Sequence, residues 1–289
     1  MTPMPDLIMH INYFESGYEL SYAFDKVIEH GFDGVELRGA SRDGLSTEEY
    51  LKQVQAEMDR TGMTTVLLSL NANFMSGIAE KRQAELDRWS EVLKRGIDMG
   101  VKTFNTFTGT LVLPGIPYTQ FERHGSGCAQ IEHYQWGTEA YQALGAIAEA
   151  GGARLAFETH NAYLHDLAKP AAKLCDMIGS PAVGVNLDMG NIVLNSKGEP
   201  LAQALQILEG KIFYLHLKNM ILPRGAGQSY SACHISDGII DNRVMLRTLK
   251  EQGFDGPIGL EAPRQGDRDY FAKVDLAYVR SLCADLGWE

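Results

Sequence analysis

The sequence of 289 residues is poor in cysteine and contains no long apolar run. Its cysteines form no CxxC pair and are too sparse for a disulfide scaffold, so reduced thiols are expected at Cys128, Cys175, Cys233 and Cys283. No apolar stretch reaches about 18 residues, the length typical of a transmembrane helix. The first residues, MTPMPDL, lack the basic and apolar segments of an export signal. These absences predict a cytoplasmic protein that does not contact a membrane.

Positive charge is also scarce. The chain carries 26 Lys and Arg against 37 Asp and Glu, which gives a formal net charge of −11, and it has no cluster of basic residues. A nucleic-acid-binding protein normally has such a cluster to neutralise phosphates. The charge therefore argues against a nucleic-acid partner and favours a small-molecule substrate.

The remaining composition, with 45% hydrophobic and 22% charged residues, is typical of a soluble enzyme. Strand-like and helix-like segments alternate along the whole chain without a break in composition, which predicts one domain over residues 1–289. Eight such pairs with nearly continuous apolar strands indicate an α/β fold, a single (β/α)₈ TIM barrel. The expected strands are 8–14, 34–37, 64–70, 102–107, 155–158, 183–188, 213–216 and 258–261, and the expected helices are 18–30, 47–60, 80–99, 134–150, 170–178, 200–208, 242–252 and 271–286.

Two connections are too long for simple turns. They follow the fourth and seventh strands and comprise Gly109–His133 and Asn219–Asp241. Long loops in a compact domain are usually functional. Because both follow a strand, we expect both at the C-terminal mouth of the barrel, where at least one covers the substrate.

The last four strands each end in a residue that binds metals in proteins. These residues are Glu158, Asp188, His216 and Glu261, separated by 30, 28 and 45 positions. The C-terminal ends of barrel strands converge on one mouth, so the four side chains are expected to meet there. Three carboxylates and one imidazole suit a hard or borderline divalent cation. The spacing therefore predicts one metal ion at the mouth.

Five motifs give the chain a resemblance to a known family, namely GFDGVEL at 31–37, FETH at 157–160, VNLDMGN at 185–191, HLKN at 216–219 and GLEAP at 259–263. In these the sequence resembles the xylose-isomerase-like TIM-barrel superfamily of sugar isomerases, epimerases, 3-dehydroshikimate dehydratases and related lyases. The resemblance implies that Glu158, Asp188, His216 and Glu261 bind one divalent metal ion. It implies Mn²⁺ as the commonest metal, with Mg²⁺, Co²⁺ or Zn²⁺ in relatives.

The chemistry of this ligand set fits such an activity. A divalent ion polarises a substrate carbonyl and stabilises the enediolate that forms when a proton or a carboxylate leaves the adjoining carbon. The resemblance to sugar epimerases gives Glu158 and Glu261 the roles of base and acid. The stretch ETHNAYLHD at 158–166 is similar to the 3-dehydroshikimate dehydratases, which implies that His160 moves protons or binds a substrate oxygen.

One departure from the family pattern distinguishes between activities. Many relatives have a histidine three residues after the aspartate of the sixth strand, where this chain has Asn191. Asparagine can bind a hydroxyl or carboxylate group but cannot shuttle a proton. We therefore expect a metal-dependent lyase that decarboxylates or dehydrates a small keto-sugar or keto-sugar acid. A metal-dependent keto-sugar isomerase or epimerase is the alternative.

Further candidates for substrate binding are Glu36, His10, Lys218, Arg224 and His234. Glu36 could instead pair with Arg38 at the mouth, and His10 could be a core or rim residue. We expect Lys218 to reach the rim from the face of its strand opposite His216. Arg224 and His234 lie in the loop after the seventh strand, where a cation could bind an anionic group.

Two other classes of protein are alternatives to such an enzyme. A DNA-repair endonuclease of the same fold conflicts with the acidic charge and with Asn191, because those relatives bind three zinc ions through several more histidines. A sugar-binding barrel without catalysis would keep the pocket. The resemblance is also compatible with a homo-oligomer, a dimer or tetramer.

Overall fold

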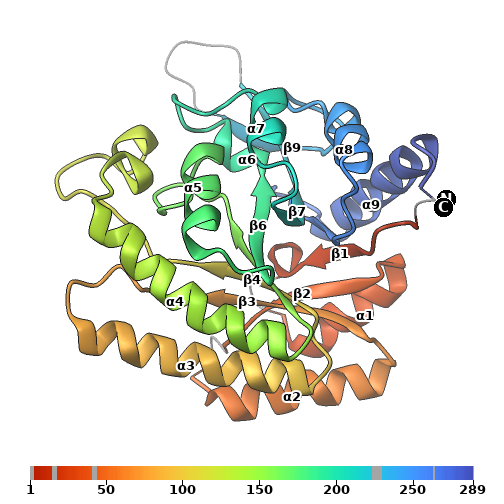
Figure 1. The fold of residues 1–289 in the computed structure, drawn as a ribbon. Coiled ribbons are helices and arrows are strands. Elements are labelled where there is room, and N and C mark those ends of the chain that lie inside the picture. The colour runs from red at the N-terminus through yellow and green to blue at the C-terminus, as the bar shows by residue number, and fades with distance from the viewer. Residues whose placement is uncertain (1–2, 15–17, 41–43, 223–229, 263, 289) are drawn as a thin grey trace.

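Eight parallel strands close into a barrel in the computed structural model, which describes residues 3–14, 18–40, 44–222, 230–262 and 264–288. The order around the barrel is β1-β10-β7-β6-β5-β4-β3-β2, and the pairing of Leu7 with Ile258 closes it (Figure 1). The strands are β1 Leu7–His10, β2 Gly34–Arg38, β3 Thr65–Asn71, β4 Thr103–Phe107, β5 Arg154–Glu158, β6 Val183–Asp188, β7 Ile212–Leu217 and β10 Ile258–Leu260. The predicted (β/α)₈ barrel is confirmed.

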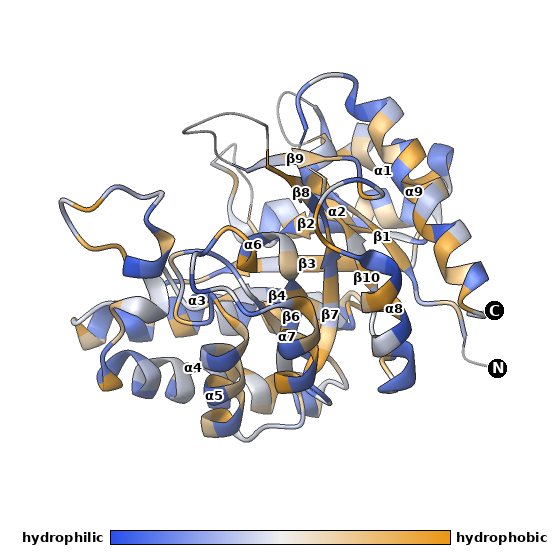
Figure 2. Cartoon of the chain, turned by 90° about the horizontal axis from the view of Figure 1, so that it is seen from above, coloured by the Kyte–Doolittle hydropathy of each residue, from blue (hydrophilic) through white to orange (hydrophobic). Residues whose placement is uncertain are grey.

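Helices cover the outside of the barrel (Figure 1). They are α1 Leu20–His30, α2 Thr47–Thr61, α3 Ala79–Asp98, α4 Ile131–Ala150, α5 Ala168–Ile178, α6 Met189–Ile192, α7 Leu201–Ile207, α8 Asn242–Glu251 and α9 Arg268–Asp285. Figure 2 shows hydrophobic residues concentrated on the strands, whereas most helices carry hydrophobic and hydrophilic residues on different faces. Burial of the apolar faces against the strands is therefore the main force that holds the helices in place.

The barrel interior is packed in layers, as in other barrels of this kind. One apolar layer consists of Ile8, Leu67, Ala156 and Tyr214, which come from β1, β3, β5 and β7. Because side chains alternate along a strand, β2, β4 and β6 fill the layer above it, toward the mouth. That layer is polar and contains Glu36, Asn105 and Asn186, all buried. The polar mouth thus rests on an apolar base.

The structure differs from the sequence expectations at several element ends. The first strand ends at His10, and residues Ile11–Tyr13 form a 3₁₀ helix because Nδ1 of His10 accepts a hydrogen bond from the backbone N–H of Asn12. Helix α4 begins at Ile131, earlier than expected, since Gln130 and His133 cap it reciprocally. The segment after β7 contains an antiparallel pair, β8 Asn219–Ile221 and β9 Ser231–Cys233, where a loop without secondary structure was expected.

Among the described residues, none of the helices has the length and apolar character needed to cross a membrane.

Candidate metal centre and active site

Four side chains from neighbouring strands meet at the mouth of the barrel. Glu158 ends β5, Asp188 ends β6, His216 lies in β7, and Glu261 follows β10. One ligand atom from each of the four lies within 4.8 Å of the others. All four residues are buried, with exposed fractions of 3, 0, 1 and 7% respectively. The structure therefore brings together the four residues expected from the sequence, in an arrangement that could hold a metal ion.

The electrostatics of this cluster attract positive charge. Burial disfavours the ionised form of Glu158, but His216 beside it outweighs that effect and the pKa of Glu158 falls to about 2. Burial raises the pKa of Asp188 to about 6, because it outweighs the opposite effect of the positive charge on Lys218 beside it. Burial also opposes protonation of His216, yet Glu36 and Glu158 raise its pKa well above the usual value. A divalent cation can supply the charge that these groups otherwise take from a proton.

The orientation of His216 fits a metal ligand. Its Nε2 atom lies 2.8 Å from Oε2 of Glu36, which fixes the imidazole from behind. Its Nδ1 atom points to the cluster, 3.1 Å from Oε2 of Glu261 and 3.5 Å from Oε2 of Glu158, and has no hydrogen bond of good geometry among the described residues. Metal-bound histidines commonly have such a carboxylate on the second ring nitrogen.

Glu36 is itself held by the polar layer. Its carboxylate accepts hydrogen bonds from the hydroxyl of Tyr214, at 2.6 Å, and from the amide of Asn105, at 3.0 Å. The tyrosine reaches this position because the neighbouring residue is Gly259, where a Cβ atom would lie 2.2 Å from the hydroxyl oxygen. Gly259, in the GLEAP motif, thus leaves space for the Tyr214 hydroxyl, which holds Glu36 in the position that orients His216.

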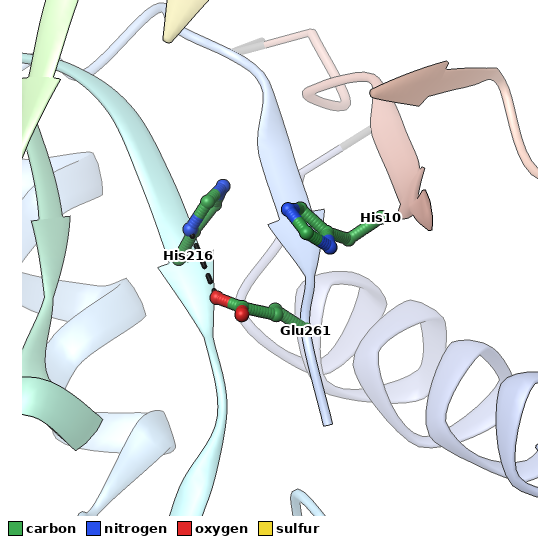
Figure 3. A group of neighbouring side chains, drawn as sticks. All are labelled: His10, His216 and Glu261. Atoms are coloured by element: carbon green, nitrogen blue, oxygen red, sulfur yellow. Dashed lines mark ion pairs between the residues drawn. The ribbon is translucent and has the colours of Figure 1, made fainter. Parts of the chain in front are cut away.

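His10 stands beside the cluster on the β1 side. Figure 3 shows its ring projecting toward His216 and Glu261, and the two imidazole rings are 5.2 Å apart in an edge-to-face arrangement. Because Nδ1 of His10 accepts a backbone hydrogen bond, the neutral ring carries its proton on Nε2, which lies 3.7 Å from Oε1 of Glu36. His10 therefore presents an N–H group at the floor of the cavity.

Asn191 fixes two of the carboxylates. Its amide nitrogen donates to Oε1 of Glu158 at 2.9 Å and to Oδ2 of Asp188 at 3.0 Å, and also to the carbonyl of Thr159. Its backbone N–H donates to Oδ1 of Asp188, because Asp188 caps the short helix α6. The structure therefore places Asn191 behind the carboxylates, and its expected contact with substrate stays a prediction.

Lys218 lies on the same face as His216, so the expectation of opposite faces was wrong. Residues two apart on an extended strand point to the same side. The ammonium is 2.7 Å from Oδ2 of Asp188 and 3.2 Å from Oε2 of Glu261, and it is buried. Gly190 makes room for it, since a Cβ atom there would lie 2.3 Å from Cγ of Lys218. Lys218 thus neutralises part of the charge of the carboxylates.

A cavity of about 390 Å³ opens in front of the cluster. Glu158 and Glu261 line it, whereas Asp188 and His216 are not among its lining residues. Asn12 also lines the cavity and donates a hydrogen bond of 2.7 Å to Oε1 of Glu261. The other lining residues are His10, Ile11, Glu36, Leu37, Arg38, Gly39, Ala40, Ser69, Asn71, Arg88, Trp89, Asn105, Phe107, His160 and Tyr163. This volume suits a small molecule.

His160 faces this cavity, two residues beyond Glu158. Its ring packs edge-on against Phe107 and Tyr163, with centroids 5.8 and 5.2 Å away. The backbone turns sharply in this loop, because Ala162 adopts a left-handed conformation with φ of 66°. The aromatic rings hold the imidazole at the rim, in reach of a molecule bound at the carboxylates.

One sequence candidate, His234, lies elsewhere. Nε2 of His234 lies 3.4 Å from Oδ1 of the buried Asp275, and the residue does not line the cavity. Asp275 also accepts hydrogen bonds from Tyr13 and Arg264, so this group joins the β8–β9 segment to α9. Arg224 falls outside the described residues.

Sequence reasoning missed several residues of the cavity wall. Arg88, Trp89, Phe107 and Tyr163 line it without having been expected there. Arg88 and Trp89 belong to α3. In a sequence, an arginine on a helix cannot be distinguished from an ordinary surface residue, so its place in the cavity was not predicted. Arg38 was expected at the mouth only as an ion-pair partner of Glu36. It follows Glu36 by two positions and therefore shares its face.

Comparison with known proteins agrees with this geometry. A family model described as xylose isomerase-like TIM barrel matches residues 24–282. The chain belongs to this family. The predicted resemblance is confirmed.

Solved structures of low sequence identity share the fold. A xylose isomerase-like TIM barrel protein from Mycobacterium smegmatis, in complex with magnesium, is 18% identical with a TM-score of 0.75, and the match covers 99% of this chain and 100% of that one. A D-psicose 3-epimerase from Clostridium cellulolyticum H10, with D-tagatose, is 17% identical with a TM-score of 0.75, and the match covers 96 and 99%.

One curated relative matches over a shorter region. The chain is 29% identical to a mannonate dehydratase of Brachyspira hyodysenteriae over 86 residues, which are 29% of this chain and 24% of that protein. The alignment thus spans about a quarter of the relative's length.

Proposed function

We propose that the protein is a divalent-metal-dependent lyase of the cytoplasm. It removes carbon dioxide or water from a small keto-sugar or keto-sugar acid through an enediolate. The proposal rests on one observation, the convergence of three carboxylates and one imidazole within 4.8 Å at the mouth of the barrel.

The donor set supports a hard divalent metal ion. Glu158, Asp188, Glu261 and His216 would hold the ion, and mainly oxygen ligands favour Mn²⁺ or Mg²⁺ over softer metals. We propose Mn²⁺. When bound, the ion supplies Lewis-acid stabilisation of the negative charge that develops on the substrate oxygens.

Two carboxylates of the cluster face the substrate cavity and carry the proton transfers. For a dehydration, either Glu158 or Glu261 takes the proton from the carbon next to the carbonyl group. The hydroxyl group on the following carbon then leaves as water, after it receives a proton from the other acid or from His160. For a decarboxylation, the electron pair of the broken carbon–carbon bond forms the enediolate, and one of these acids protonates that carbon.

The preference for a lyase is supported by Asn191. Its amide hydrogens are engaged by Glu158, Asp188 and Thr159, and an amide cannot carry a proton between the two faces of a substrate. The partial similarity to a mannonate dehydratase is compatible with loss of water.

A keto-sugar isomerase or epimerase is the second candidate. Glu158 and Glu261 both line the cavity, so one could remove a proton and the other return it on the opposite face. The similarity in fold to a D-psicose 3-epimerase is compatible with that use.

The decisive experiment restores metal to chelated enzyme and screens keto-sugars and keto-aldonates by mass spectrometry in D₂O. A lyase gives a product lighter by carbon dioxide or water. A product of unchanged formula that gains solvent deuterium would refute the lyase and establish the second candidate.

The same assay tests the two acids. Glu158→Gln and Glu261→Gln should each lower kcat at least a hundredfold, because each substitution removes an acid–base group and a charged ligand. The exposed carboxylate of Glu132, on α4, provides the matched control Glu132→Gln, which should keep full activity. Full activity in either cavity variant would contradict the assignment.

A further inference from the structure

The cavity extends from the metal-binding cluster to the opposite side of the barrel. In the barrel order β2 lies across from β6, and β3 lies across from β7. The four candidate ligands belong to β5, β6, β7 and the end of β10, whereas Arg38 ends β2 and Arg88 lies on α3, which follows β3. Both arginines line the cavity. One cavity thus has carboxylates at one end and guanidinium groups at the other.

The position of Arg38 follows from strand geometry. It pairs in register with Ser69 of β3, one step above the layer that contains Glu36. The carboxylate of Glu36 is occupied by Tyr214, Asn105 and His216, so the ion pair between Glu36 and Arg38 considered from the sequence is not among the contacts of Glu36. Arg38 lines the cavity above this layer.

Arg88 is held in place by the buried Trp89. The indole N–H donates to Oε2 of Glu85 at 3.0 Å, and the same oxygen accepts the backbone N–H of Asn73 at 3.1 Å. Nη1 of Arg88 lies 3.8 Å from the other oxygen of Glu85, and its guanidinium carbon lies 4.8 Å from the centroid of the Trp89 ring. The side chain of Arg88 is still 49% exposed. The guanidinium is thus anchored on one side and open on the other.

We propose that Arg38 and Arg88 form a subsite for an anionic group of the substrate, a carboxylate or a phosphate. The inference rests on the proposed function, in which the carbonyl of the same molecule lies at Glu158 and Glu261. Guanidinium groups bind both kinds of anion through paired hydrogen bonds. Because the subsite lies across the barrel from the metal cluster, the anion bound there is a non-reacting group that orients the substrate. In a protein with a net charge of −11, these cations also attract an anionic ligand to the mouth.

The test uses three probes that share a 2-keto six-carbon skeleton and differ only at C6. They are D-fructose with a hydroxymethyl group, D-fructuronate with a carboxylate, and D-fructose 6-phosphate with a phosphate ester. Binding is measured by calorimetry with Mn²⁺-loaded and with metal-free protein. We expect at least one anionic probe to bind about tenfold more tightly than D-fructose, and the stronger of the two identifies the anion.

Substitutions assign the preference to the arginines. Arg88→Met and Arg38→Met keep aliphatic bulk and should each reduce the preference for the anionic probe over D-fructose about three- to tenfold. Arg88→Lys should retain part of the preference. Arg247→Met, at an exposed position of α8 outside the cavity, is the matched control and should leave the preference unchanged. Thermal unfolding of each variant separates a binding defect from a folding defect.

The outcomes separate this inference from the proposed function. If all three probes bind equally, if none binds, or if the preference survives both methionine substitutions, the anion subsite is wrong. Mn²⁺-dependent binding of D-fructose in the same experiment would leave the proposed function intact. Anion preference without any bound Mn²⁺ would support the subsite and reject the metal-dependent mechanism.

Discussion

Glu36 illustrates how one buried side chain can orient a candidate metal ligand, His216, without belonging to the ligand set itself. Its carboxylate is fully buried, and burial alone would raise its pKa, but His216 and His10 outweigh burial and lower the pKa instead. It therefore stays ionised and holds Nε2 of His216, which leaves Nδ1 directed at the carboxylates. The sequence suggested that Glu36 contacts either the substrate or the residues behind it. Its hydrogen bonds give it the geometry of a positioning residue, and contact with the substrate stays a prediction.

We expect Glu36→Gln to weaken metal binding. A glutamine can still accept a hydrogen bond but carries no charge, so it holds the imidazole less strongly; changes at such supporting partners commonly cost about 10- to 100-fold in metal affinity. Titration with Mn²⁺ followed by electron paramagnetic resonance measures the effect. The exposed Glu139 of α4 supplies the control Glu139→Gln, which removes the same charge far from the cluster. Equal affinities in the two variants would exclude a positioning role.

At the residue scale, the sequence predicted which side chains form the central cluster, but it did not predict all the residues that line the cavity. Strand-end position alone placed Glu158, Asp188, His216 and Glu261 together, because barrel strands all end at the same mouth. Arg88 could not be found in this way, since its approach to the cavity depends on the packing of α3 through Trp89. The predicted orientation of Lys218 was wrong, because residues two apart on a strand, such as His216 and Lys218, point to the same side.

Packing between elements depends on small residues at close approaches. Gly96 of α3 faces β4, and a Cβ atom there would lie 2.7 Å from Cε1 of Phe104 and 3.2 Å from a methyl group of Leu68. Gly137 of α4 differs, because its Cβ would meet Leu164 and Leu174 at 3.4 and 3.5 Å, ordinary contact distances. Both glycines are helical and buried, so they form a matched pair.

Replacement of each glycine by alanine should change stability in opposite directions. Alanine favours a helix over glycine by up to about 1 kcal/mol. At Gly96 the overlap with the fully buried Phe104 exceeds this gain, so Gly96→Ala should lower the free energy of unfolding by about 1–3 kcal/mol. Gly137→Ala should raise it by about 0.5–1 kcal/mol. Urea denaturation measures both, and a stabilising Gly96→Ala would show that α3 can move away from β4 at little cost.

At the element scale, periodicity predicted the barrel strands and major helices because their apolar faces must be buried in any such barrel. The β8–β9 pair was not predicted, since three-residue strands are too short to show alternation. The short 3₁₀ helix after β1 was also not predicted. A local hydrogen bond to His10 ends the strand there, although the sequence continues with apolar residues. Local polar contacts therefore determine where some elements end, and the hydrophobic pattern does not predict these positions.

For the molecule as a whole, the candidate metal site would link four strands that are distant in sequence. Three of them, β5, β6 and β7, are adjacent in the barrel, and β10 follows β7. An ion held by all four opposes any separation of these strands. Its binding free energy is added to the stability of the folded chain, because the unfolded chain does not preserve the ligand geometry.

Mn²⁺ should therefore raise the melting temperature. At a free concentration 100 times Kd, binding stabilises the folded state by about 2.7 kcal/mol, which corresponds to an increase of several degrees for a chain of this size. Differential scanning calorimetry with Mn²⁺ and with chelator measures the shift, and Asp188→Asn should reduce it. An unchanged melting temperature across a wide range of Mn²⁺ concentration would be evidence against a metal site at this mouth.

The location of Glu261 directly after the closing strand also bears on the synthesis of the protein. A nascent chain emerges from the ribosome with Glu158, Asp188 and His216 well before β10, whose pairing with β1 joins the two ends of the barrel. The full ligand set is complete only once that seam has formed. On the proposed function, acquisition of the ion by all four ligands would be a late event in biogenesis. A chain that stalls before residue 258 has neither a sealed barrel nor its last carboxylate.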